Sequence, residues 1–269
     1  MDSRLVQLNP LTPAIDQRDR LVTQTNQQVY LSVVIPVYRV RACLDELYRR
    51  LVTSLSSLTT NFEVILVDDG CPEDSWITIK RFVQQDARFH GINLSRNFGQ
   101  HRAITAGLDM TRGEWIVVMD GDLQDQPEEI TKLMKKTEEG FDVVLAKRLD
   151  RNDPLLRKSC SFLFAKLLGF LTDTKQDPST ANFGVYHRRV IDSINHMREN
   201  MRFFPLMVQW AGFQTCAIDV NHAKRTVGKS SYSLLKLIKL AMEAAVSFSN
   251  KPLRLFVTFG FVLSFGAFL

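Results

Sequence analysis

The sequence is poor in cysteine, and it has no internal repeat and no low-complexity tract. Its four cysteines, Cys43, Cys71, Cys160 and Cys216, are widely spaced and form no Cys-x-x-Cys pair. This spacing argues against a zinc site and against a disulfide framework, so we expect reduced, structural thiols. The basic residues are not interleaved with stacking aromatic residues, which argues against a groove for nucleic acid.

The remaining composition is that of an ordinary folded protein, with 45% hydrophobic and 23% charged residues. A chain of 269 residues can hold one sizeable domain or two small ones. The formal net charge of +5 is mild, but it is unevenly distributed. Many basic residues fall in one C-terminal stretch: Lys224, Arg225, Lys229, Lys236, Lys239, Lys251 and Arg254.

The two ends of the chain differ in character. Residues 1–29 are polar and contain two prolines, so we predict a flexible N-terminal extension. Residues 256–269 carry no charge, but these 14 residues are shorter than the roughly 20 that span a bilayer. This segment either packs into a core or belongs to a truncated membrane helix. We favour the second interpretation and predict that residues 253–269 start a transmembrane helix, with the preceding chain on the cytoplasmic side.

Between these ends, apolar strands alternate with helical segments. We predict strands at 31–38, 62–67, 91–94, 114–119 and 141–146, and helices at 43–58, 75–89, 99–110 and 127–138. The alternation with short connections predicts a parallel sheet covered by helices on both faces. Because ligands of such sheets bind beyond the carboxyl ends of the strands, functional residues are expected there.

Asp120 and Asp122 follow the fourth predicted strand directly and are separated only by Gly121. Two carboxylates at this spacing can share one hard cation, and Mg²⁺ or Mn²⁺ is often held by one or two carboxylates together with substrate phosphates. The pattern therefore indicates a metal that carries a diphosphate. The alternative is a solvated acidic turn. Other strand ends also carry distinctive residues, namely Pro36, Tyr38, Asp68, Asp69, Arg96 and Arg148.

Two later segments have amphipathic helical spacing, at 155–171 and 231–248. Most such helices face a core. Because lysines flank their apolar residues and an apolar run follows, they also match helices that lie in a membrane interface.

Taken together, the motifs resemble the family 2 glycosyltransferases of GT-A type, and within them the polyprenyl-phosphate branch. The resemblance is carried by five short motifs and by two basic clusters. The motifs lie at 33–38, 67–70, 97–107, 119–124 and 127–129, and the clusters at 147–151 and 225–232. It implies an α/β fold with a Rossmann-like, mostly parallel sheet and helices on both faces. A catalytic domain at 30–228, a juxtamembrane amphipathic helix at 229–252 and the transmembrane segment would follow in that order.

The resemblance also implies an activity, which is inverting transfer of a sugar from a nucleotide sugar to an undecaprenyl or dolichyl phosphate. Its cofactor would be Mg²⁺ or Mn²⁺, and its donor would be of UDP, GDP or dTDP type, with UDP preferred. The product would serve the synthesis of cell-surface glycans or glycolipids. We expect the enzyme at the cell inner membrane, with its catalytic domain facing the cytoplasm, and a homo-oligomer is possible.

Residue roles follow from the same resemblance. Asp122 would hold the cation with Asp120 and Gln124. Catalysis would rest on Asp122 and on Arg148 and Arg151, whose guanidinium groups would face a phosphate. The remaining donor-binding residues would be Pro36, Tyr38, Asp68, Asp69, Arg96 and Gly99, with Asp68 on the nucleotide base. Arg225, Lys229 and Ser230 would meet a phosphate of the acceptor. Simpler roles are a turn cap for Asp68, a solvated surface pair for Arg148 and Arg151, and a topology signal for Lys229.

The chain departs from the family pattern at two places. Relatives commonly have Asn-Glu where this chain has Arg39-Val40, and an acid and an arginine where it has Asn182 and Gly184. Asn182 cannot act as a base. The departures leave open a different sugar or acceptor, and they leave open a membrane-attached pseudoenzyme that binds a nucleotide sugar without turnover.

Overall fold

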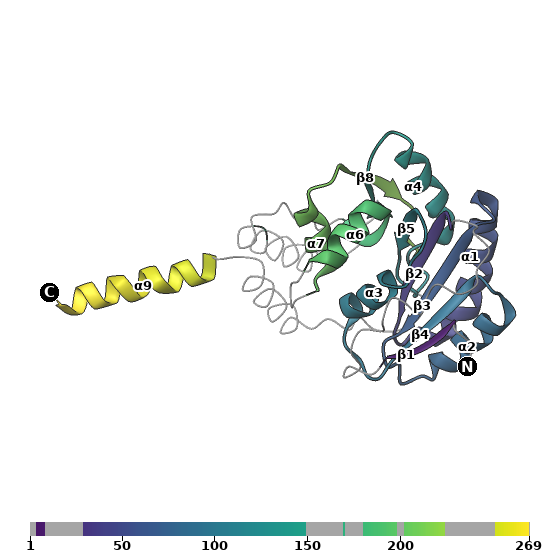
Figure 1. The fold of residues 1–269 in the computed structure, drawn as a ribbon, viewed down its shortest axis with the longest axis horizontal. Helices are drawn as coiled ribbons and strands as arrows, with labels where there is room; N and C mark the ends of the chain where they lie inside the picture. The colour runs from purple at the N-terminus through teal and green to yellow at the C-terminus, as the bar shows by residue number, and fades with distance from the viewer. Residues whose placement is uncertain are drawn as a thin grey trace.

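The computed structural model describes residues 4–8, 29–148, 169, 180–197, 202–223 and 251–268, and its centre is an eight-stranded mixed sheet (Figure 1). The strand order is β1-β4-β3-β2-β5-β7-β6-β8. The strands are β1 (Leu5–Leu8), β2 (Leu31–Val37), β3 (Phe62–Asp68), β4 (Phe89–Leu94), β5 (Trp115–Val118), β6 (Val143–Arg148), β7 (Thr180–His187) and β8 (Thr215–Val220). Neighbours pair in parallel except β7, which is antiparallel to both β5 and β6.

Helices cover the sheet on both faces (Figure 1). They are η2 (Arg41–Cys43), α1 (Leu44–Leu58), α2 (Ser75–Gln85), α3 (Gln100–Leu108), η3 (Pro127–Glu129), α4 (Ile130–Thr137), α6 (Arg188–His196), α7 (Phe204–Ala211) and α9 (Lys251–Phe268). One buried cluster joins α1, α2 and α4 to the sheet, and a second joins α3, α6 and α7 to its other face. The predicted α/β architecture with helices on both faces is therefore confirmed.

Local sequence explains why these elements form. Leu44, Leu47, Leu51 and Leu55 recur at helical spacing along α1, and all four are buried against the sheet. On the other face, Gly107 lets α3 approach β2 closely, because an added Cβ would lie 2.4 Å from Val34 Cγ1. An alanine at this position would force the helix away from the sheet.

The predicted strands match β2 to β6, with small changes at their ends. The largest change concerns Phe89, which was predicted to end a helix. The helix α2 ends at Gln85, and Asp86 is extended, with φ −136° and ψ 118°. Phe89 then starts β4, where it pairs with Val64 and is fully buried. Strand pairing at Phe89 thus outweighs the helical pattern of the preceding residues.

Three strands were not predicted from the sequence. Leu5–Leu8 form β1 and pair in parallel with β4, so this part of the expected flexible extension belongs to the sheet. β7 inserts between β5 and β6, and β8 extends the sheet beyond β6. As a result, the carboxyl ends of β2, β3, β5, β6 and β8 lie along one edge of the sheet, together with the start of the antiparallel β7.

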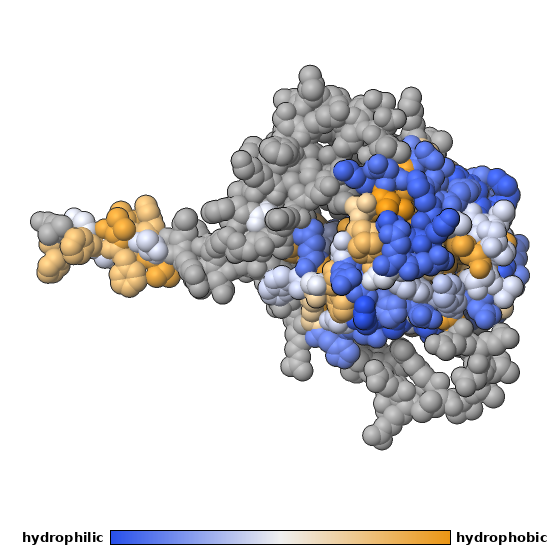
Figure 2. All heavy atoms as spheres, turned by 90° about the horizontal axis from the view of Figure 1, so that it is seen from above, coloured by the Kyte–Doolittle hydropathy of each residue, from blue (hydrophilic) through white to orange (hydrophobic). Residues whose placement is uncertain are grey.

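The C-terminal helix α9 stands apart from the sheet and exposes apolar side chains, which form the orange surface at its end of the molecule (Figures 1 and 2). Phe261 is 73% exposed and Phe268 is 90% exposed. Across the described residues, no helix reaches the length and apolarity needed to cross a membrane. The predicted amphipathic helix at 231–248 lies outside the described residues, as does the one at 155–171 except for residue 169.

Candidate active site

The loop 120–124, which we call the carboxylate loop, follows β5 at the edge of the sheet where the carboxyl ends of the parallel strands lie. Gly121 allows this loop to approach β2, because an added Cβ would lie 3.2 Å from Ile35 Cγ2. Asp122 is 5% exposed, and its Oδ1 accepts a hydrogen bond from the Gln124 amide at 3.1 Å. Leu123 has a φ of +62°, so the chain turns back on itself there. The two aspartates are therefore presented on a tight, well-held turn.

Two further residues hold Asp120 in place. Gln100 Nε2, at the start of α3, donates to Asp120 Oδ1 at 2.5 Å. The Asp120 amide donates to Asp125 Oδ2 at 3.1 Å, and Asp125 is itself buried. The side chain and the backbone of Asp120 are thus fixed by different neighbours. Neither Gln100 nor Asp125 was predicted as a site residue, although Gln100 lies within the 97–107 motif and Asp125 directly follows the 119–124 motif.

The carboxylate loop has the donor chemistry expected for Mg²⁺ or Mn²⁺. The side chains of Asp120, Asp122 and Gln124 each offer oxygen ligands of the kind that a hard cation prefers. Within the part of the chain that the structure describes, no group of three or more His, Cys, Asp or Glu side chains forms a complete metal cage. Two carboxylates suit an ion that takes its other ligands from water and substrate phosphates, as Mg²⁺ commonly does.

Asp68 ends β3, which β2 separates from β5, and it is 2% exposed. Its Oδ1 accepts a hydrogen bond from the Cys71 amide at 2.7 Å, so the turn cap considered from the sequence is present. Burial raises the pKa of the Asp68 carboxyl, although hydrogen bonds from backbone amides oppose the shift. Its predicted contact with the nucleotide base stays a prediction.

Asp69 organises the loop that leads into α3. Its Oδ1 accepts from the Phe98 amide at 2.7 Å, and its Oδ2 accepts from the Gly99 amide at 3.0 Å. Burial raises the pKa of this carboxyl too, with the same two amides opposing the shift. Gly99 has a φ of +95°, which favours glycine at this position. Asp69 therefore positions the start of α3, from which Gln100 reaches Asp120.

The end of β2 is shaped by an arginine at a departure from the family pattern. Arg39 has a φ of +56°, and its amide contacts Cys71 Sγ at 3.1 Å. Its guanidinium lies 5.4 Å from the centre of the half-buried Tyr38 ring. Positive φ is better tolerated by asparagine, the residue that relatives commonly have there. Pro36 is half-buried nearby, while Arg96 is exposed and its guanidinium lies 4.7 Å from the Phe98 ring.

The second departure also lies at this edge. Val118, the last residue of β5, pairs with Gly184 on β7, and Asn182 lies two residues nearer the start of β7. A Cβ at Gly184 would lie 3.0 Å from Val144 O, so a larger side chain would require the strands to shift. The carbonyl of Asn182 accepts a hydrogen bond from the Tyr186 hydroxyl at 3.3 Å.

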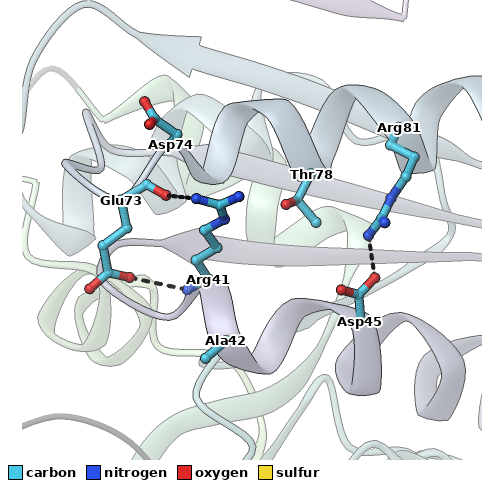
Figure 3. A pocket seen from close by; sticks show the side chains of 7 residues that line it. All are labelled: Arg41, Ala42, Asp45, Glu73, Asp74, Thr78 and Arg81. Carbon is cyan, nitrogen blue, oxygen red and sulfur yellow. Dashed lines mark hydrogen bonds and ion pairs between the residues drawn. The ribbon is translucent and has the colours of Figure 1, made fainter.

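A pocket of about 710 Å³ lies between the start of α1 and the start of α2 (Figure 3). Both arginines that line it are already engaged: Arg41 Nη1 donates to the backbone carbonyl of Glu73 at 3.0 Å, and Arg81 forms an ion pair with Asp45. Because both arginines already have hydrogen-bond partners and the pocket contains no predicted site residue, it is a weak candidate for a diphosphate.

Not every predicted site residue can be placed. The backbone of Arg148 ends β6 and is in register with Val220. Arg151, Arg225, Lys229 and Ser230 lie outside the described residues. His222, which the sequence did not indicate, lies beside the carboxylate loop, with its Nδ1 3.6 Å from Asp125 Oδ1.

Comparison with known proteins identifies the family. The profile of Glycosyl transferase family 2 matches residues 32–194. The chain belongs to this family. It is 37% identical over 243 residues to a protein from Salmonella choleraesuis (strain SC-B67) named undecaprenyl-phosphate 4-deoxy-4-formamido-L-arabinose transferase, and the match covers 88% of this chain and 73% of that protein.

A second relative of this family 2 glycosyltransferase is the uncharacterized glycosyltransferase YkcC of Bacillus subtilis (strain 168). It is 35% identical over 245 residues, covering 91% of this chain and 76% of that protein. A solved mycobacterial protein shares the fold with a TM-score of 0.54 at 16% identity, over 79% of this chain and 71% of that one. The enzyme class and the resemblance to the polyprenyl-phosphate branch are thereby confirmed.

Proposed function

We propose that this family 2 enzyme transfers a sugar, with inversion, from a nucleoside diphosphate sugar to a polyprenyl phosphate. The observation that carries the proposal is the position of the carboxylate loop. Asp120 and Asp122 follow the carboxyl end of β5, and Asp68 lies at the carboxyl end of the parallel strand β3, so the three residues are at the same end of the sheet. The relative from Salmonella, whose name includes undecaprenyl phosphate, supports this acceptor class. UDP is our preferred nucleotide, and GDP and dTDP are the alternatives.

In the proposed reaction, an oxygen of the acceptor phosphate attacks the anomeric carbon, and the bond to the nucleoside diphosphate breaks. A phosphate monoester is already an anion near neutral pH, so it needs little help from a base, and Asn182 is compatible with this chemistry. The main task is to stabilise the leaving diphosphate.

We assign that task to the residues around the carboxylate loop. Asp120, Asp122 and Gln124 would hold Mg²⁺ or Mn²⁺, and the bound cation would supply Lewis-acid neutralisation of charge on the leaving diphosphate. Arg148 and Arg151 would donate hydrogen bonds to phosphate oxygens. Asp68 would accept a hydrogen bond from the base, with Pro36 and Tyr38 lining its pocket, while Asp69, Arg96 and Gly99 would shape the donor loop. Arg225, Lys229 and Ser230 would meet the acceptor phosphate.

We also propose that α9 contacts a membrane at the cytoplasmic face of the cell inner membrane. Its exposed phenylalanines and its basic residues Lys251 and Arg254 suit a boundary between anionic headgroups and lipid tails. A lipid acceptor would reach the active site from the same surface.

The test is sugar transfer by the full chain in detergent, with undecaprenyl phosphate, Mg²⁺ or Mn²⁺ and a panel of labelled nucleotide sugars. We expect label from one donor to enter the lipid phase. Asp122→Ala and a chelator should abolish transfer. Glu139→Gln, which alters an exposed ion pair on the far end of α4, should leave it unchanged.

Two outcomes would contradict the proposal. Transfer that persists in Asp122→Ala would remove the carboxylate loop from the mechanism. Donor binding without transfer to lipid would favour the alternatives, which are a nucleotide-sugar-binding pseudoenzyme or a transferase with a non-lipid acceptor.

A further inference from the structure

The loop that leads into α3 is held by the turn after β3, and we call its residues 96–100 the entry loop. Asp69 accepts the Phe98 amide through Oδ1 at 2.7 Å and the Gly99 amide through Oδ2 at 3.0 Å. Gly70 lies against the same loop, because an added Cβ there would be 2.5 Å from one of its backbone carbonyl carbons. The turn therefore fixes the entry loop both by hydrogen bonds and by direct backbone contact.

Gly99 is also held from the side of the helix. Its carbonyl oxygen accepts the Arg102 amide at 3.0 Å and the Ala103 amide at 3.1 Å, and Ala103 is fully buried. With both the amide and the carbonyl of Gly99 engaged, the backbone of the next residue, Gln100, has little freedom. The place from which the Gln100 side chain starts is thus set by Asp69 and by α3.

Gln100 extends from this fixed backbone to the carboxylate loop. Its side chain is half-buried, and its Nε2 donates to Asp120 Oδ1 at 2.5 Å. Because the amide group is neutral, it orients the carboxylate without cancelling the negative charge that suits a divalent cation. Partners of this kind fix the orientation of a metal ligand, and their loss typically lowers metal affinity about 10- to 100-fold.

We propose that Asp69 and Gln100 form a link through which the turn after β3 sets the cation affinity of Asp120. Gln100 is a positioning residue, which acts through Asp120 without touching the substrate. The inference rests on the proposed function, which assigns the cation to Asp120 and the nucleotide base to Asp68. Because Asp68 directly precedes Asp69, the nucleoside and the cation would be bound at the two ends of one link.

The first test compares the Mn²⁺ affinity of Gln100→Met and Gln84→Met in the full chain, by electron paramagnetic resonance. Each is saturated with UDP, GDP or dTDP, whichever raises the parental Tm most. Methionine is close to glutamine in length and lacks the donor group, and Gln84 is exposed on α2. We expect the affinity to fall about 10- to 100-fold in Gln100→Met and less than about 2-fold in Gln84→Met.

Two further readouts separate positioning from loss of the fold. The Tm of the metal-free chain should differ by less than about 4 °C between Gln100→Met and Gln84→Met, since one hydrogen bond is lost. Raising the Mn²⁺ concentration should restore most of the sugar transfer by Gln100→Met, because the defect lies in the affinity for the cation.

A double-mutant cycle tests the part of the link that involves Asp69. Asp69→Asn keeps the size of the side chain but cannot accept both backbone amides, so it should lower the Mn²⁺ affinity about 10-fold. In the Gln100→Met background the same substitution should cost less than about 3-fold, because the link is already open. If the two effects multiply instead, Asp69 acts independently of Gln100 and the link is overturned.

Hydrogen exchange in the metal-free chain tests the link without any activity. The side-chain amide protons of Gln100 should exchange about 10-fold faster in Asp69→Asn than in the parent chain, and those of Gln84 should not change. Unchanged exchange at Gln100, or equal Mn²⁺ affinity in Gln100→Met and Gln84→Met, would overturn the inference and leave the proposed function intact.

The proposed function can fail separately. If the parent chain transfers no sugar to lipid but the Mn²⁺ affinities change as expected, the proposed acceptor is wrong and the link stands. A parent chain that binds no Mn²⁺ with any of the three nucleotides would overturn both.

Discussion

At the scale of single residues, His101 shows how burial ties stability to pH. Its ring packs edge-on against Phe203, with centroids 4.6 Å apart, and its Nδ1 is buried without a hydrogen-bond partner among the described residues. Burial lowers the pKa of His101 from 6.5 to about 4. The folded protein therefore favours the neutral imidazole.

The sign of the resulting pH dependence follows from linkage. Between pH 6.5 and 4 the unfolded chain binds a proton at His101 and the folded chain does not. The contribution of His101 is fully present above pH 6.5 and is lost as the pH falls through this window, by at most about 1.4 kcal/mol per pH unit. We predict that His101→Phe, which keeps a ring against Phe203, flattens this part of the stability profile.

Urea unfolding at several pH values measures the effect. The control is His196→Gln on the exposed end of α6, which should keep the parental slope. An identical slope in His101→Phe and the parent chain would show that His101 is not the group responsible.

At the scale of elements, the sequence predicted the parallel half of the sheet better than the remainder. β2 and β3 are continuous apolar runs buried on both faces, so their composition alone indicates strands. β7 contains Gly184 and polar residues, and β8 alternates exposed and half-buried residues along most of its length. These strands depend on pairing with β6, which local composition does not reveal.

The residues of the candidate site likewise fall into two groups, those predicted from the sequence and those that only the structure shows. Asp68, Asp120 and Asp122 were predicted because each lies at or just beyond the end of a predicted strand. Gln100, Asp125 and His222 were missed because their role depends on contacts between separate elements. Sequence reasoning identified the residues suited to bind ligands, and the structure added those that hold them in place.

The opposite edge of the sheet offers a test of element packing. Glu63 on β3 is 2% exposed; it accepts hydrogen bonds from Ser32 Oγ at 2.6 Å and from Arg112 Nη2 at 2.6 Å. Its Oε1 also accepts the Arg112 amide at 2.7 Å. This one carboxylate thus connects β2, β3 and the loop before β5.

We predict that Glu63→Ala lowers the free energy of unfolding by about 3 kcal/mol, because buried donors lose their acceptor. The estimate stays at the lower end for a buried pair, since the Arg112 side chain is 46% exposed and can be hydrated. Urea denaturation measures the change. Glu139→Gln, in an exposed ion pair with Lys136, should cost less than about 1 kcal/mol. An equal loss of unfolding free energy in the two variants would contradict the prediction. Because Glu63 lies at the edge opposite the candidate site, Glu63→Ala should also leave the affinity for the sugar donor unchanged.

At the scale of the whole molecule, ligand binding should be visible as global stability. A ligand that binds only the folded state stabilises it by about 2.7 kcal/mol at a concentration 100 times its Kd. We predict that the preferred nucleoside diphosphate with Mn²⁺ raises the Tm, and that a chelator removes most of this rise. Asp122→Asn should also remove it, because the proposed cation would lose a charged ligand.

Thermal unfolding with UDP, GDP and dTDP then identifies the base. Asp68→Asn should reduce the differences among the three nucleotides, while the exposed substitution Glu139→Gln should preserve them. A Tm rise that persists in the chelator would show that nucleotide binding does not require the metal. A rise that is equal for all three nucleotides in the parent chain would remove Asp68 from base recognition.

The position of β7 has a consequence for the order in which the protein is made. Among the described strands, β5 gains its second neighbour from Thr180–His187, and β6 pairs with β7 and β8. During synthesis at about 5–20 residues per second, the β1 to β5 portion therefore emerges with an open edge at β5 seconds before its partner exists. An open edge of this kind invites pairing with other chains. Fragments that end before residue 180 should accordingly aggregate, and the ribosome-bound chain should be a substrate for chaperones until β7 closes the sheet.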